Sequence, residues 1–158
     1  MKLDGRPRNS ENPELYSVFP FGLYGLGKPD LDIARRTCAR RRCRLDGGWN
    51  QDPVDAALLG MTEEAAAHLC RQTRMKDERA LFPAFWGPNF DEAPDQDHGG
   101  MTLLCMIYML LQTDGTGYTA FPAWPEKWDV RFRLPVGRGT VVCGEQAGGV
   151  RRVWEERG

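Results

Sequence analysis

The first two thirds of the chain carry hydrophobic residues at helical spacing, and the last third carries them in alternation with polar ones. Leu31, Ala34 and Cys38 fall on one helical stripe after Asp30, a residue type that caps helix starts, so we expect a helix within residues 30–44. Much of its remaining surface is arginine (Arg35, Arg36, Arg40, Arg41, Arg42 and Arg44). A basic helix can bind phosphate groups, but a solvated outer face is more common, and we interpret the arginines in that way.

Two short helices are expected next, joined by a tight turn. Asp52 is placed as an N-cap with Pro53 at the first helical position, and Gly60 suits the left-handed residue that follows a helix. A second helix begins at Thr62 with acidic residues in its first turn, so the pair forms an αα-hairpin. His68 lies inside this second helix, and we interpret it as a packing or surface residue.

Residues 101–111 form a nearly unbroken apolar run. Because the apolar residues leave no polar face, the run predicts a helix that is buried on every side. Asp114 and Gly115 follow it and are typical of a turn.

The remainder of the chain has the pattern of strands. Alternation predicts strands in "YTAFPAWP" and in "WDVRFRLP", the second stopped by its proline. "GTVVCG" and "VRRVWE", divided by Gly148 and Gly149, predict a β-hairpin. Helices therefore precede strands, and we expect two packed parts, a helical one over residues 1–116 and a β one over residues 117–158.

Composition and charge exclude several classes of partner. The 158 residues have a net charge of −1 and are 41% hydrophobic, which is ordinary globular composition. A near-neutral chain has no field that draws it to nucleic acid or to a membrane surface, and its longest apolar run is too short to span a bilayer. The first residues contain no signal-peptide pattern. The five cysteines are scattered without zinc-ligand spacing, so we expect reduced thiols.

The segment "APDQDHGG" places Asp95, Asp97 and His98 directly before the apolar run. Loops are usually polar because they are solvated, but paired carboxylates on an ordered, aromatic-rich loop are also what acid–base chemistry on sugars requires. Apolar surroundings raise the pKa of one carboxyl, while hydrogen bonds or a cation keep another ionised. Asp97 and Asp95 are therefore the candidate catalytic residues. A metal site from the same three residues is disfavoured because adjacent side chains do not converge easily on one ion, so we expect no metal.

Aromatic and amide side chains in the same part of the sequence would supply sugar binding. Trp49 and Trp86 offer flat faces to a pyranose ring, although tryptophans are more often plain core residues. Asn50, Asn89 and His98 would bind the hydroxyl groups of the sugar.

Five segments, in this order, resemble the C-terminal part of bacterial six-hairpin, (α/α)6-toroid glycosidase-like proteins related to the inverting α-L-fucosidases. The segments are "NPELYSVFPFGLYG", "GGWNQDPVDAALLG", "FPAFWGPNFDEAPDQDHGG", "MLLQTDG" and "FPAWPEKWDV". They lie within residues 12–140. The resemblance implies a mainly α fold, an incomplete (α/α)6 toroid made of its last helical hairpins and followed by the first strands of a C-terminal β-domain.

The resemblance also implies roles for single residues. In those fucosidases an aspartate in the loop before a buried helix acts as general base, and Asp97 takes its position, although residues 98–100 differ from their Gly-Asn-Phe. "GGWN" is similar to the start of an inner helix, which would place Trp49 and Asn50 near the pocket. The implied partner is a carbohydrate substrate whose glycosidic bond is hydrolysed with inversion and without a cofactor.

An inverting hydrolase needs a second carboxyl as general acid, and the resemblance places that residue, with the N-terminal part of the toroid, upstream of this chain. The nearest carboxyl within the chain is Glu14. We therefore expect a fragment of a longer enzyme whose full-length relatives are periplasmic or secreted. Two alternatives remain open: a catalytically inactive carbohydrate-binding or scaffold module that depends on Trp49 and Trp86, and a truncated product without independent activity.

Overall fold

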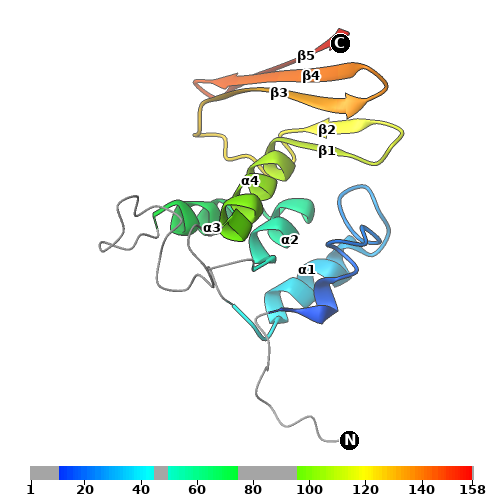
Figure 1. The fold of residues 1–158 in the computed structure, drawn as a ribbon, viewed down its shortest axis with the longest axis vertical. Helices are drawn as coiled ribbons and strands as arrows, with labels where there is room; N and C mark the ends of the chain where they lie inside the picture. The colour runs from blue at the N-terminus through cyan, green and yellow to red at the C-terminus, as the bar shows by residue number, and fades with distance from the viewer. Residues whose placement is uncertain (1–10, 45–49, 75–95, 158) are drawn as a thin grey trace, which may run out of the picture.

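The computed structural model describes residues 11–44, 50–74 and 96–157 (Figure 1). In these residues a group of helices is followed along the chain by two antiparallel sheets. The helical elements are the 3-10 helix η1 (Pro13–Leu15), α1 (Leu31–Arg40), α2 (Asp52–Leu58), α3 (Thr62–Arg74) and α4 (Gln96–Leu110). The strands are β1 (Leu111–Thr113), β2 (Tyr118–Ala120), β3 (Val130–Gly137), β4 (Thr140–Ala147) and β5 (Val150–Arg157).

The expected fold class is wrong, because the chain is not a mainly α toroid. The described residues form four α-helices and five strands, about 39% helix and 25% strand. The final 28 residues of these, Val130–Arg157, pair as a three-stranded meander in the order β3-β4-β5. Their alternation of apolar and polar residues and their glycine-containing turns favour antiparallel pairing, independently of how the preceding helices pack.

The centre of the helical part is formed by α2, α3 and α4, which pack on one another (Figure 1). The predicted hairpin of α2 and α3 is confirmed, with Gly60 at φ 65 between them. The positive φ favours glycine here, and a Cβ at Gly60 would also displace the end of the Leu26 side chain, whose Cδ2 would lie 2.8 Å from it. Gln112 Nε2 donates to Ala57 O over 2.8 Å. The carboxyl-terminal ends of α2 and α4 therefore meet, and both helices begin away from this contact.

Tertiary contacts change the expected helix caps. Asp30 is the N-cap of α1, but with φ 58 its side chain makes no capping hydrogen bond. The N-cap of α2 is Gln51, and Asp52 is the first residue of the helix instead of its cap. The carboxylate of Asp52 is engaged by Arg41 and Asn12, because a buried carboxylate is stable only with charged or hydrogen-bonding partners.

Helix α4 is only partly buried, so the expectation of burial on every side is wrong. Its buried side chains include Thr102, Cys105 and Met109, which face α2 and α3 or the core between them. Leu103 lies 57% exposed on another face. The helix is apolar on all sides, yet the other described elements cover only one part of its surface.

The apolar run does not end as a helix. The chain leaves α4 at Leu110, and Leu111 begins β1, which pairs in an antiparallel hairpin with β2. The predicted turn at Asp114 and Gly115 is confirmed as the end of this hairpin, with Gly115 at φ 88. The hairpin carries the Asp114 turn to the same end of α4 at which α2 finishes.

The second sheet confirms the predicted β4–β5 hairpin, whose turn is Gly148 and Gly149. The expected stop at Pro135 is wrong, since β3 continues through the proline to Gly137 with an irregular register between the two residues. Because β3 is an edge strand of its sheet, it tolerates a residue without a backbone N–H.

One apolar core joins the helices to the sheet. It includes residues from α2, α3 and α4 together with Phe121, Phe132 and Val142. Phe121 and Phe132 meet edge to face with ring centroids 5.3 Å apart. A smaller cluster packs η1 and α1 against Leu59. The domain boundary at residues 116 and 117 stays a prediction.

Candidate functional site

The predicted catalytic residues are only partly within the described residues. Asp97 lies in the first turn of α4 with its side chain exposed, so it belongs to the helix and not to the loop before it. His98 follows it in the same turn, and nothing further of its side chain is described. Four predicted site residues lie outside the described residues: Trp49, Trp86, Asn89 and Asp95. Their roles stay predictions.

Asn50 is the one predicted sugar ligand whose side chain the structure describes, and it is 2% exposed. Its Oδ1 accepts a hydrogen bond of 2.9 Å from the backbone N–H of Asp52, the first residue of α2. Asn50 therefore holds the start of α2 from inside the protein. Its proposed contact with substrate stays a prediction.

A buried cluster of charged groups lies where α1 meets α2 and α3. Arg41 is 5% exposed, and its Nε donates to Asp52 Oδ2. Its Nη2 lies 2.7 Å from Glu64 Oε1 and 3.2 Å from His68 Nε2, while its Nη1 donates to Cys38 O over 2.7 Å. Burial by itself lowers the pKa of Arg41, but the hydrogen bond and charge of Asp52 more than offset it and raise the pKa. The interpretation of Arg41 as a solvated arginine is wrong.

Asn12 ties the chain before η1 to the same cluster. Its Nδ2 donates to Asp52 Oδ1 over 2.7 Å and to Cys43 O over 2.9 Å, and its Oδ1 accepts from Cys43 N over 3.0 Å. We call Asn12, Arg41, Asp52, Asp55, Glu64 and His68 the buried polar junction. Asp52 thus has a partner on each carboxylate oxygen.

Asp55 is the unusual member of the buried polar junction. It lies one turn after Asp52 in α2 and is 1% exposed, and its Oδ1 has no hydrogen-bond partner among the described residues. Burial, and then the negative charge of Asp52, raise the pKa of Asp55 to about 8. Sequence reasoning missed it, although one signal was present: Asp55 interrupts "PVDAALL", which is otherwise apolar.

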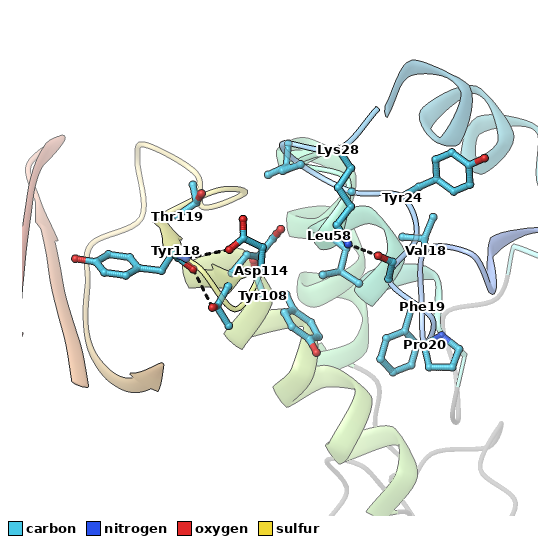
Figure 2. A pocket seen from close by; sticks show the side chains of 16 residues that line it. Val18, Phe19, Pro20, Tyr24, Lys28, Leu58, Tyr108, Asp114, Tyr118 and Thr119 are labelled. Carbon is cyan, nitrogen blue, oxygen red and sulfur yellow. Dashed lines mark hydrogen bonds between the residues drawn. The ribbon is translucent and has the colours of Figure 1, made fainter. Parts of the chain in front are cut away.

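A cavity of about 360 Å³ lies at the other end of α2 and α4, where both helices finish. Its walls are the loop from Val18 to Lys28, the end of α2 and the β1–β2 hairpin (Figure 2). Figure 2 shows Lys28 and Asp114 on opposite sides of this space. We call this space the hairpin cavity. Its volume falls within the range of small-molecule sites.

Asp114 is rigidly held in the hairpin cavity. Its Oδ1 accepts from Thr116 N, Thr116 Oγ1 and Gly117 N over 2.8, 2.7 and 2.9 Å. These bonds, led by the Thr116 hydroxyl, lower the pKa of Asp114 to about 2. Asp114 is therefore a carboxylate at neutral pH, and its Oδ2 accepts no hydrogen bond from the residues that the structure describes.

A second cavity, of about 570 Å³, lies between the start of α3 and the segment from Phe121 to Trp128. Gln146 holds that segment by donating from Nε2 to the carbonyls of Pro125 and Trp128 over 2.8 and 2.7 Å. Asp97 lines neither of the two cavities.

The described ranges contain neither a candidate metal cluster nor a candidate membrane-spanning helix. Residues 11–44, 50–74 and 96–157 contain no cluster of three His, Cys, Asp or Glu side chains that would hold a metal ion. Burial raises the pKa of the Cys38 and Cys105 thiols to about 12, which leaves them protonated and unreactive. Over the same ranges, no helix combines the length and the apolar character needed to cross a bilayer.

The chain was compared with protein-family models, with curated proteins and with solved structures. No family model, no curated protein and no solved structure matches it.

Proposed function

We propose that the protein hydrolyses a glycosidic bond with inversion and that Asp97 is the general base that activates water. The five sequence segments that resemble glycosidase-like proteins support the reaction class. The observation that carries the proposal is the exposed position of Asp97 in the first turn of α4. A general base must reach a water molecule beside the substrate, and an exposed carboxylate on a packed helix meets that condition.

The packing of α4 supports this role because it fixes the position of the base. Thr102 lies one to two turns after Asp97, and its Oγ1 is 3.2 Å from Gln72 Oε1 on α3. Further along α4, Met109 is fully buried in the core. A carboxylate on a rigid element needs little reorganisation before it reacts.

The general acid is not Asp55. Its pKa of about 8 is that of an acid which is protonated at neutral pH, as proton donation requires. Its side chain is nevertheless only 1% exposed, so a substrate has no access to the carboxyl group. Asp55 therefore contributes to stability and not to proton transfer.

The proposal is tested by the variant Asp97→Asn, assayed on a panel of 4-nitrophenyl glycosides that includes the α-L-fucoside. We expect kcat to fall by roughly 10²–10⁴-fold, the usual contribution of a general base, while KM changes little. Asp32→Asn is the matched control, because Asp32 is also an exposed aspartate in the first turn of a helix and its loss should leave kcat unchanged.

Product stereochemistry gives an independent readout. Proton NMR of the first anomer released should show inversion, since water attacks directly in a mechanism with a general base. Retention of configuration, or activity of Asp97→Asn within about tenfold of the unaltered protein, would show that Asp97 is not the base. Absence of hydrolysis over the whole panel in the unaltered chain would contradict the proposed activity itself.

A further inference from the structure

The hairpin cavity presents two hydrogen-bond acceptors that the described residues do not use. Asp114 Oδ2 accepts no hydrogen bond from the described residues, because all three bonds to this side chain end on Oδ1. Gln112 has the same asymmetry: Nε2 donates to Ala57 O and Tyr108 O over 2.8 and 2.9 Å, which uses both amide hydrogens and leaves Oε1 as an acceptor. The free atoms of the cavity wall therefore favour a ligand that is rich in donors.

Each of these acceptors is fixed in place by its own bonds. The Asp114 carboxylate is held by the turn that it closes, and the Gln112 amide bridges the ends of α2 and α4. A ligand that pairs with them does not have to immobilise the side chains first, which removes an entropic cost of binding. The cavity is thus preorganised on the side of the β1–β2 hairpin.

The opposite side of the cavity supplies a cation and apolar surface. Lys28 Nζ donates to the backbone carbonyl of Gly22 at the rim of the cavity. Below it, Figure 2 shows Phe19, Pro20 and the ring of Tyr108 grouped together. A flat ligand in this cavity would lie with one face against the apolar side chains and with its edge near the two acceptors.

The charges indicate that the ligand is neutral. Lys28 and Asp114 are of opposite sign and lie on opposite walls, so the cavity has no net preference for an anion or a cation (Figure 2). An α-amino acid is also neutral overall, but its ammonium and carboxylate are joined through a single carbon and do not span two facing walls. A ring with hydroxyls around its edge and C–H groups on its face matches both the acceptors and the apolar surface.

We propose that the hairpin cavity binds a monosaccharide unit, with Asp114 Oδ2 and Gln112 Oε1 accepting hydrogen bonds from its hydroxyls. The choice of a sugar among neutral polyols rests on the proposed function. The cavity lies at the ends of α2 and α4, whereas Asp97 lies at the start of α4. It is therefore a binding site apart from the proposed catalytic residue, one that would hold a sugar unit without cleaving it.

The test is saturation-transfer NMR and calorimetry of the full chain with L-fucose, D-galactose, D-glucose and D-xylose, with L-serine and glycerol as comparison ligands. We expect at least one monosaccharide to bind and Asp114→Asn to weaken it by about tenfold or more, because the variant replaces a charged acceptor by a donor while retaining Oδ1 for the turn. Asp129→Asn is the matched control, since Asp129 also accepts a backbone hydrogen bond through Oδ1 outside the cavity.

The inference would be overturned if none of the four sugars binds, or if their binding is the same in Asp114→Asn and Asp129→Asn. Binding of L-serine or glycerol with the same dependence on Asp114 would also overturn it, because the site would then take another class of ligand. The outcome is separate from that of the hydrolysis assay. Sugar binding that requires Asp114 in a chain without hydrolytic activity would support the cavity and contradict the role of Asp97.

Discussion

The buried polar junction and the β1–β2 hairpin place an aspartate in opposite surroundings. Asp55, in the junction, has a pKa raised to about 8 by burial and by the nearby charge of Asp52. Asp114, in the hairpin turn, has a pKa lowered to about 2 by hydrogen bonds from Thr116 and Gly117. At neutral pH most of the Asp55 population is protonated, while Asp114 is ionised. The same residue type therefore has different chemistry because Asp55 lost water without gaining a partner for its Oδ1, whereas Asp114 gained hydrogen bonds while remaining in water.

The comparison explains why the two regions suit different roles. A buried acid next to an ion pair affects the stability of the fold, because any change in its charge is expensive inside the protein. An exposed, fixed carboxylate is able to bind a ligand without first losing a partner. Three predictions sharpen this contrast, beginning with the largest effect.

The largest effect is expected from Arg41→Ala in the buried polar junction. The substitution leaves the Asp52 carboxylate buried without its charged partner, which should lower the free energy of unfolding by about 3–5 kcal/mol. Urea denaturation at neutral pH measures the change. Arg40→Ala is the control, because Arg40 is the exposed neighbour in α1 and its loss should cost no more than about 0.5 kcal/mol. Equal stability of the two variants would show that the ion pair does not support the fold.

The second prediction is that Asp55 makes the free energy of unfolding depend on pH. The pKa of Asp55 is about 8 in the folded protein and near 3.8 in an unfolded chain, so between these values the folded state binds more protons. Stability due to this group must therefore fall as the pH rises, by about 2 kcal/mol between about pH 6 and 7.5. Asp55→Asn removes the titrating group and should remove this part of the slope.

Urea denaturation of both proteins across this range measures the slope. All other titrating groups remain in both proteins, so the difference between the two curves isolates Asp55. Parallel curves would mean that Asp55 titrates in the folded protein as it does in an unfolded chain.

The smallest effect is expected from Asp114→Asn, and its sign is opposite. The pKa of Asp114 is about 2 in the folded protein and 3.8 in an unfolded chain. The carboxylate therefore stabilises the fold fully at pH values above 3.8, and this stabilisation disappears as the pH falls through about 2. The difference in Tm between the variant and the unaltered protein should be constant at neutral pH and narrow in acid below the unfolded pKa. If the difference in Tm narrowed toward alkaline pH instead, the pKa of Asp114 would not be lowered in the folded protein.

Local signals were sufficient for the hairpins of this fold. Gly60 ends α2 before α3, and Gly148 and Gly149 connect β4 to β5, as their positions in the sequence predict. In each case the requirement for a positive φ arises within a few residues of the chain, so no distant contact is needed to specify it. Asp97 was expected in the loop before the apolar run, but α4 begins one residue before it, so Asp97 lies in the first turn of the helix.

Other features depend on partners that are distant in the sequence. The arginines within residues 35–44 look alike in the sequence, yet among them only Arg41, which directly follows α1, meets Asp52, Glu64 and His68 of α2 and α3. Leu103 belongs to a run that predicts complete burial, but no other described element covers its face of α4. The prediction of a toroid, which came from the resemblance of five short segments, was wrong because such segments do not specify how many helices pack around one another.

The sequence by itself determined where most helices, strands and turns form, because spacing, proline and glycine act over a few residues. Only the tertiary structure decided that Asp55 is buried without a partner for one of its oxygens and that Lys28 faces Asp114 across a cavity. The physical reason is that burial and charge are properties of the space around a side chain. Segments that are far apart in the sequence form these surroundings, whereas the signals for helices, strands and turns act over only a few residues.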